Sequence, residues 1–175
     1  MLTLREIARQ IATADGIGPD DEEALYQRAR VLYQKGVVHP VETATRGQTA
    51  RYDAQSAAMV RLLLVLGDVG VSIADARPLF SKPNLSEGTS GIVRPATEFG
   101  AALMGIGSGE DWELLIEFRR HRETGERMLR GGFRRIGEQP NALARQMLDD
   151  QAALHATVVV PLTSLVSSIL RASED

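Results

Sequence analysis

The sequence predicts a mainly α-helical protein, a winged helix-turn-helix with a small β-hairpin wing, followed by a helical C-terminal domain. Apolar residues recur at helical spacing along most of the chain. Two short segments, 37–41 and 49–52, are instead typical of paired strands between the second and third helices. A stretch over residues 81–91 is rich in Pro, Gly and Ser, which indicates a linker. It divides the chain into domains at 1–80 and 92–175.

The first two helices are predicted from their end signals. Thr3 precedes Glu6 by three residues, which is the spacing of an N-terminal capping box. A second helix, about 20–35, follows Pro19, because proline suits the first position of a helix. Gly36 ends it, as glycine commonly does just past a helix. We therefore expect two helices joined by a short turn.

Further helices are predicted at residues 54–68, 73–80, about 95–104, 110–129 and about 140–171. The last of these carries apolar side chains at mixed spacings of three, four and seven, as in the seam between packed or paired helices. The side chains of this stripe are Leu143, Met147, Leu154, Val158, Leu162, Leu165 and Ile169. We expect the stripe to form the interface of a homodimer.

Composition excludes several classes of protein. The chain has 175 residues, a formal net charge of −3 and no cysteine. The charge argues against a basic nucleic-acid coat protein, and the lack of cysteine excludes a disulfide framework, a zinc finger and a thiolate metal sensor. The sequence shows no acid–base pair, catalytic triad or metal-ligand set, so we expect no enzyme activity, no metal and no cofactor. Because no apolar run reaches the ~18 residues of a membrane helix, we expect a cytoplasmic protein without a membrane partner.

Three segments of the N-terminal domain carry motifs in a particular order. They are residues 35–40 (Lys-Gly-Val-Val-His-Pro), residues 51–53 (Arg-Tyr-Asp) and residues 62–80, where a Leu-rich run leads into Gly-Asp-Val-Gly-Val-Ser-Ile-Ala-Asp-Ala-Arg-Pro-Leu-Phe. Their order and spacing resemble those of the MerR family of transcription regulators, and the resemblance covers about residues 2–80. It implies a regulator that binds double-stranded DNA as a homodimer, with a recognition helix at about 20–35 and a wing at about 37–52.

Seven side chains on the expected recognition helix and wing are candidates for contacting DNA. They are Tyr26, Gln27, Arg28, Arg30, Arg46, Arg51 and Tyr52. Glutamine can read adenine and arginine can read guanine through paired hydrogen bonds in the major groove. Tyr52 fits better as a packing residue whose hydroxyl touches the surface, and the others can equally be solvated surface residues. Acidic residues 20–23 oppose binding to phosphate; they are either an ordinary charge cluster at a helix start or a block that a partner or ligand must move.

The C-terminal domain holds a cluster of seven arginines: Arg119, Arg120, Arg122, Arg127, Arg130, Arg134 and Arg135. Interleaved glutamates favour an ion-paired helix face, while a surface for an anion, a nucleic acid or a partner stays open. A small-molecule or protein effector is compatible with this domain, with a pocket around Phe99, Met104 and Trp112 as one hypothesis. The competing hypothesis for the whole chain is a protein-interaction or effector-binding module on a winged helix that no longer binds DNA.

Overall fold

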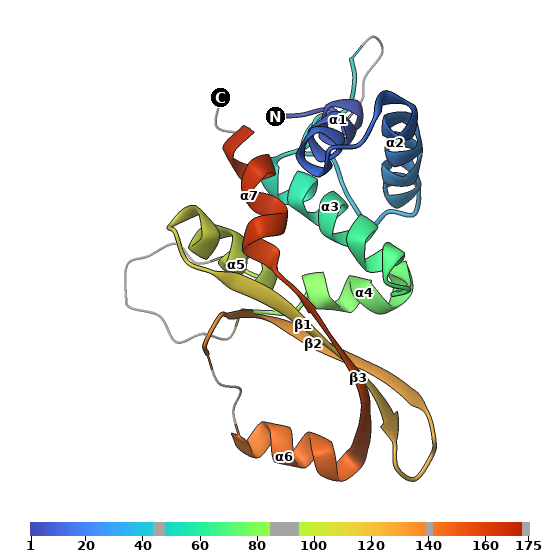
Figure 1. Ribbon diagram of the computed structural model, residues 1–175, viewed down its shortest axis with the longest axis vertical. Helices are drawn as coiled ribbons and strands as arrows, with labels where there is room; N and C mark the ends of the chain where they lie inside the picture. The colour runs from blue at the N-terminus through green and yellow to red at the C-terminus, as the bar shows by residue number, and fades with distance from the viewer. Residues whose placement is uncertain (44–47, 85–94, 139–141, 173–175) are drawn as a thin grey trace. The chain divides into compact units, whose positions relative to one another are not determined.

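The computed structural model describes residues 1–43, 48–84, 95–138 and 142–172 (Figure 1). It is 51% helix and 23% strand, an α/β mixture. The predicted mainly α fold with a helical C-terminal domain is therefore wrong. The chain forms two compact units, residues 1–77 together with 164–175, and residues 78–163.

The first unit is built from helices. These are α1 (Leu4–Asp15), α2 (Pro19–Gln34), α3 (Ala54–Asp68), most of α4 (Ile73–Phe80) and most of α7 (Leu162–Ala172). The helices predicted within residues 1–80 are confirmed, because their ends carry local signals that act within a few residues.

Side-chain caps and one glycine mark these helix ends. The Thr3 hydroxyl accepts from the Glu6 N–H, and the Glu6 carboxylate accepts from the Thr3 N–H, which completes the capping box. Gly16 ends α1 at φ 65°, a left-handed conformation that glycine adopts without a steric penalty. The Asp53 side chain accepts from the Ser56 N–H at 2.7 Å and begins α3.

The predicted wing contains single bridges rather than two regular strands. Glu42 pairs with Arg51, and Leu2 pairs with Tyr52, both antiparallel. Pro40 has no backbone N–H to donate to a ladder, which limits pairing in the first of the two segments. Residues 44–47, at the centre of the expected wing, lie outside the described residues.

The last helix, α7, packs in the first unit. Val166 and Ile169 are fully buried there. Arg61 of α3, only 5% exposed, donates to the Ser168 hydroxyl at 3.0 Å and forms an ion pair with Asp15 at the end of α1. One buried guanidinium thus connects three helices that are far apart in the sequence.

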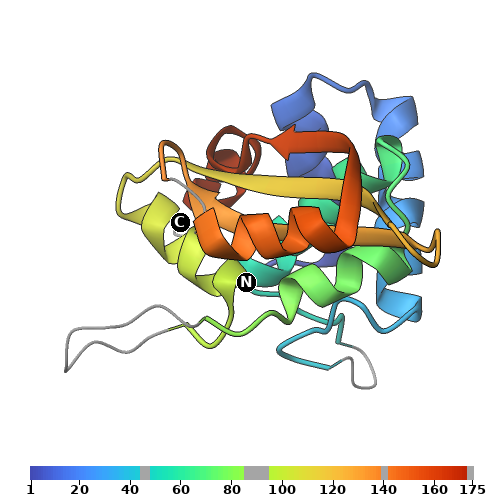
Figure 2. The same cartoon turned by 90° about the horizontal axis from the view of Figure 1, so that it is seen from below.

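The second unit is an α/β structure. It contains α5 (Glu98–Gly107), β1 (Trp112–His121), β2 (Arg127–Arg135), α6 (Ala142–Gln151) and β3 (Ala152–Val160). The strand order is β2-β1-β3, and both outer strands run antiparallel to β1. The connection from β2 through α6 to β3 therefore passes across the central strand. Figures 1 and 2 show α5 on one side of this sheet and α6 on the other.

The two faces of the sheet differ in chemistry. Leu114 and Ile116 of β1 are fully buried on one face. Phe133, which pairs with Leu114, belongs to this face, and its ring centroid lies 5.2 Å from that of Phe99 and 6.1 Å from that of Phe80. On the other face, β1 presents charged residues toward α6. The aromatic cluster thus supplies the core of the unit.

Two helices predicted in the C-terminal half are wrong. Most of residues 110–129 form strand β1 and the turn that leads into β2, and residues 140–171 divide into α6, β3 and α7. In β1, Leu114 and Ile116 lie on the buried face, but the apolar run 114–116 obscures the alternation expected of a strand. In β3, the run from residue 157 to 160 is β-branched, which favours a strand.

Candidate functional site

Helix α2 has one exposed face of polar side chains. Gln27, Arg30 and Gln34 follow at spacings of three and four, so they share one side of the helix, and all three are exposed. The side chains of Arg30 and Gln34 make no hydrogen bond or ion pair with other described residues, while the Gln27 side chain donates to Glu23 at 2.7 Å. Gln34 is not among the residues predicted to contact DNA. Its spacing of seven from Gln27 is the sequence signal that puts it on the same face of the helix.

Arg28 connects two helices instead of facing solvent freely. Its guanidinium donates to the Leu64 carbonyl at 3.0 Å and to the Asp68 carboxylate at 2.6 Å, both on α3. These bonds fix α2 against α3, so the role seen for Arg28 is structural. Arg46, the candidate at the wing tip, lies outside the described residues.

Tyr26 and Arg51 also have partners within the first unit. The Arg5 guanidinium lies 4.3 Å from the centroid of the Tyr26 ring, a cation–π contact. Arg51 forms an ion pair with Glu6 at 3.5 Å. Hydrogen bonds from Thr3 are the main reason that the pKa of Glu6 lies below its usual value, and Arg51 lowers it further.

Tyr52 is part of the core. Its side chain is 1% exposed, and its ring meets that of Tyr33 edge to face at 6.3 Å. The hydroxyl is buried without a hydrogen-bond partner among the described residues. Burial raises the pKa of Tyr52 to about 12, with smaller contributions from Tyr33 and Tyr26. The expected packing role agrees with this position, whereas contact of its hydroxyl with DNA does not.

Two carboxylates of the acidic run are paired with arginines of α1. Glu22 lies 3.6 Å from Arg9, and Glu23 lies 3.0 Å from Arg5. A hydrogen bond from Gln27, followed by Arg5, lowers the pKa of Glu23. The repulsion that this run would exert on phosphate is therefore partly offset within the first unit.

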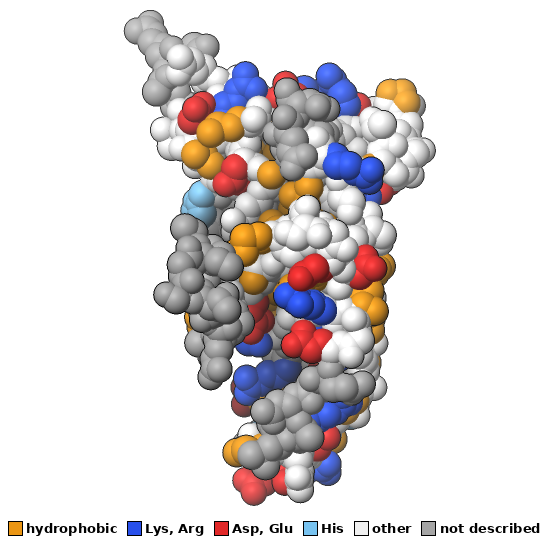
Figure 3. All heavy atoms as spheres, turned by 90° about the vertical axis from the view of Figure 1, so that its left-hand side faces the viewer, with side chains coloured by type: hydrophobic (Ala, Val, Ile, Leu, Met, Phe, Trp, Pro, Cys, Tyr) orange, Lys and Arg blue, Asp and Glu red, His pale blue; other side chains and the backbone are white. Residues whose placement is uncertain are grey.

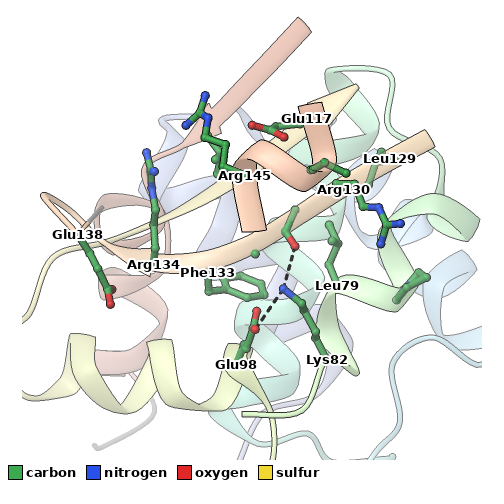
Figure 4. Close-up of a pocket in the computed structure, with 15 residues that line it drawn as sticks. Leu79, Lys82, Glu98, Glu117, Leu129, Arg130, Phe133, Arg134, Glu138 and Arg145 are labelled. Atoms are coloured by element: carbon green, nitrogen blue, oxygen red, sulfur yellow. Dashed lines mark hydrogen bonds and ion pairs between the residues drawn. The ribbon is translucent and has the colours of Figure 1, made fainter. Parts of the chain in front are cut away.

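The second unit contains a cavity of about 770 Å³ beside strand β2 (Figure 4). Its apolar lining consists of Pro78, Leu79, Leu115, Leu129, Phe133 and Leu148. Gly131 and Gly132 also line it. A Cβ atom at Gly131 would lie 2.6 Å from the Leu115 carbonyl oxygen, so only glycine fits at that position.

Charged side chains surround this apolar lining. They are Lys82, Arg130, Arg134 and Arg145 against Glu98, Glu117 and Glu138. Lys82 pairs with Glu98 at 3.2 Å and donates to the Gly131 carbonyl at 3.4 Å. In the lower part of the face shown in Figure 3, Lys and Arg side chains lie in a hollow of the surface.

A buried ion cluster stands behind the cavity. Arg119 of β1 is 2% exposed and donates to Glu117 at 2.7 Å, to Asp149 of α6 at 2.6 Å and to the Ala152 carbonyl at 3.0 Å. Burial alone would lower the pKa of Arg119, but its hydrogen bonds to Glu117 and Asp149 raise it above the usual value. Arg119 thus compensates part of the charge of Glu117 and attaches α6 to the sheet through Asp149.

The arginines of residues 119–135 lie on strands and their turn, not on a helix. Ion pairs hold Arg119, Arg134 and Arg135, the last two with Glu113 at 2.6 Å and Glu110 at 2.9 Å. The sequence predicts ion pairs along one helix, whereas the pairs of Arg134 and Arg135 join β2 to β1 and to the residues just before β1. Arg130, in contrast, makes no ion pair within the described ranges.

The pocket expected around Phe99, Met104 and Trp112 is not the cavity that the structure contains. Phe99 is fully buried in the aromatic cluster, and Met104 is exposed. The Trp112 indole donates to Glu110 at 3.0 Å. The observed cavity lies instead around β2, which no local motif in the sequence indicates.

The predicted dimer stripe is not one continuous surface. Its members are divided among Leu143 and Met147 on α6, Leu154 and Val158 on β3, and Leu162, Leu165 and Ile169 on α7. Leu162 and Ile169 are fully buried within the chain, whereas Met147 is 57% and Leu154 43% exposed. The side chain of Leu143 lies outside the described residues.

Within the described ranges, His, Asp and Glu side chains do not gather in groups of three that could hold a metal ion. No helix in those ranges is long and apolar enough to cross a membrane. Comparison of the chain with protein-family models, with curated proteins and with solved structures gives no match.

Proposed function

We propose that the chain is a cytoplasmic DNA-binding transcription regulator of MerR-like type that acts as a dimer. The observation that carries this proposal is the exposed face of α2, on which Gln27, Arg30 and Gln34 stand in one row. Helix α2 follows α1 after a short turn and is held against α3 by Arg28. A helix presented in this way can enter the major groove of DNA.

The chemistry of the row suits base recognition. Arginine can donate two hydrogen bonds to guanine, and glutamine can pair with adenine. Binding to a base would break no hydrogen bond of the Arg30 and Gln34 side chains with described residues. Gln27 would exchange its one hydrogen bond to Glu23 for a bond to a base. Because Arg5 and Arg9 pair with Glu23 and Glu22, part of the negative charge beside the row is already compensated.

The proposed dimer forms through strand β3, an edge of the sheet. Leu154 and Val159 on this strand are 43% and 49% exposed, and no residue of β3 carries a formal charge with His155 neutral. An unpaired apolar edge favours pairing with another strand. Two copies related by a two-fold axis would pair β3 antiparallel with itself, which satisfies the outward N–H and C=O groups of both strands.

Binding to DNA tests the proposal. Duplexes selected from a genomic pool are titrated with the chain at about 50 mM salt, where contacts to phosphate are strongest, and binding is followed by fluorescence anisotropy. We expect Arg30→Ala to weaken binding about tenfold or more, since a bidentate base contact contributes about 1–3 kcal/mol. Arg77→Ala, which removes an exposed arginine from α4 of the same unit, is the matched control.

Two results would count against the proposal. The first is that no duplex binds at low salt, which would favour a protein-interaction or effector-binding module instead. The second is that Arg30→Ala and Arg77→Ala weaken binding equally, which would remove the special role of the α2 face.

A further inference from the structure

We propose that the cavity of the second unit binds an organic anion, a small molecule with one carboxylate or phosphate group on an apolar body. This inference goes beyond DNA binding and stands on the cavity alone.

The cavity has the dimensions of a ligand site. Its volume of about 770 Å³ falls within the ~300–1,000 Å³ of pockets that hold small organic molecules. It lies within one unit, with walls from residues 78–82, from β2 and from α6. A ligand could therefore be bound without contribution from the first unit.

The lining calls for a ligand with an apolar part. Leu79, Leu129, Phe133 and Leu148 supply carbon surface from three separate segments. At Gly132 a Cβ atom would lie only 3.2 Å from the Lys82 ammonium and the Glu98 carboxylate, so a side chain there would crowd this part of the wall. Burial of apolar ligand surface against these side chains would supply much of the affinity.

Two guanidinium groups around the lining have no carboxylate partner. Lys82 pairs with Glu98 and Arg134 with Glu113, while Arg119 is shared between Glu117 and Asp149. Arg130 of β2 and Arg145 of α6 remain, both exposed and without an ion pair in the described part of the chain. Of the lining carboxylates, Glu138 forms no ion pair among the described residues, and Glu117 shares its arginine with Asp149.

Guanidinium groups beside an apolar cavity favour an anionic partner. Arginine binds carboxylate and phosphate through two parallel charge-assisted hydrogen bonds. In Figure 4, the side chains of Arg134 and Arg145 reach toward the same side of β2, and that of Arg130 reaches toward the other end of the strand. The arginines thus surround the apolar lining. A bound molecule would place its apolar body against this lining and its charged end at the opening, near an arginine.

Isothermal titration calorimetry of the whole chain without DNA tests this inference. The probes are 4-phenylbutyrate, 4-phenylbutyl phosphate and the neutral 4-phenylbutyramide, which share one apolar body. We expect saturable binding of at least one anion at millimolar concentration and at least tenfold weaker binding of the amide. A comparison of the two anions distinguishes a carboxylate site from a phosphate site.

Three variants locate the site. The double variant Arg130→Gln/Arg145→Gln should lose at least tenfold in affinity for the anion, while Arg127→Gln, an exposed arginine of the same strand outside the cavity, should leave it unchanged. Gly132→Val should abolish binding by filling the cavity, with folding checked by thermal unfolding.

Equal binding of the amide and the anions would overturn the proposal, as would a double variant that binds as tightly as the parent chain. Absence of binding by all three probes would also overturn it. None of these results depends on DNA, so failure here is distinguishable from failure of the proposed function.

Discussion

Tyr52 carries a buried hydroxyl whose ionisation opposes the folded state. Its pKa is raised by burial from 10.0 to about 12, so the folded chain keeps the phenol proton over a pH range in which the unfolded chain releases it. Because the folded-state pKa is the higher one, the associated stability is fully present below pH 10 and is lost as the pH rises toward 12.

We predict that the free energy of unfolding falls by about 2–3 kcal/mol more in the parent chain than in Tyr52→Phe between pH 10 and 12, at 1.36 kcal/mol per pKa unit. The variant should be as stable as the parent chain at neutral pH, because the hydroxyl has no described partner. Urea unfolding at a series of pH values measures both. Parallel curves for the two proteins would show that Tyr52 does not titrate in this way.

Arg119 is the residue on which the attachment of α6 to the sheet depends. Its removal leaves the buried Glu117 carboxylate without a compensating charge. We predict that Arg119→Ala lowers the free energy of unfolding by about 3–5 kcal/mol, the range found for broken buried ion pairs. Arg120→Ala changes the adjacent, exposed arginine and should alter stability by about 0.5 kcal/mol or less.

Chemical denaturation of both variants makes this comparison. Similar stabilities of Arg119→Ala and Arg120→Ala would mean that the buried cluster contributes little.

At the scale of elements, the helices of the first 80 residues could be predicted because their signals are local. A capping hydroxyl, a glycine just past a helix end and an apolar stripe all act within a few residues. Strand β1 could not be recognised from spacing alone, because Leu115 and Ile116 also fit a helical stripe. What decides the conformation is pairing with β2 and with β3, and β3 begins about thirty residues after β1 ends.

Strand β3 shows the same limit. Residues 152–160 lie between α6 and α7. The apolar residues of these three elements follow one another at spacings that also fit a single long helix. The β-branched run at 157–160 was a signal for a strand. The pairing of β3 with β1 cannot be predicted unless β1 itself is recognised as a strand.

The edge of β3 leads to a prediction about dimerisation. Leu154→Lys/Val159→Lys adds charge at two exposed positions. In an antiparallel pair of β3 strands, these lysines would bring four positive charges to the shared edge, and like charges across a strand pair are unfavourable. We predict that the parent chain sediments as a dimer at micromolar concentration and the double variant as a monomer.

Met104→Lys is the control, since Met104 is 48% exposed on α5, away from the strand edge. A monomeric parent chain would contradict the proposed dimer. So would a double variant that remains as dimeric as the control.

At the scale of the whole molecule, the two candidate sites differ in how far they could be predicted. The α2 face is formed by one helix, so spacing was enough to find Gln27 and Arg30. Arg28 is 36 and 40 residues away in the sequence from its two partners on α3. These contacts therefore could not be predicted from the pattern of α2 alone. The cavity requires three distant segments, and its position depends on the sheet topology.

The net charge of −3 constrains the proposed activity of the whole chain. Non-specific affinity for DNA comes mainly from phosphate contacts by basic residues, and it falls as salt rises. An acidic protein lacks a general positive field, so its binding must rely on a few placed side chains and on two copies acting together. Specific binding to DNA would therefore depend on the exposed face of α2.

Hydrogen–deuterium exchange of the 175-residue chain, with and without an excess of a selected DNA duplex, shows whether α2 contacts DNA. If α2 enters the groove, backbone amides over residues 27–35 should exchange more slowly in the complex, while those of β1 and β2 should be unchanged. Slower exchange confined to the second unit, or no change anywhere under conditions in which the duplex is bound, would contradict the claim.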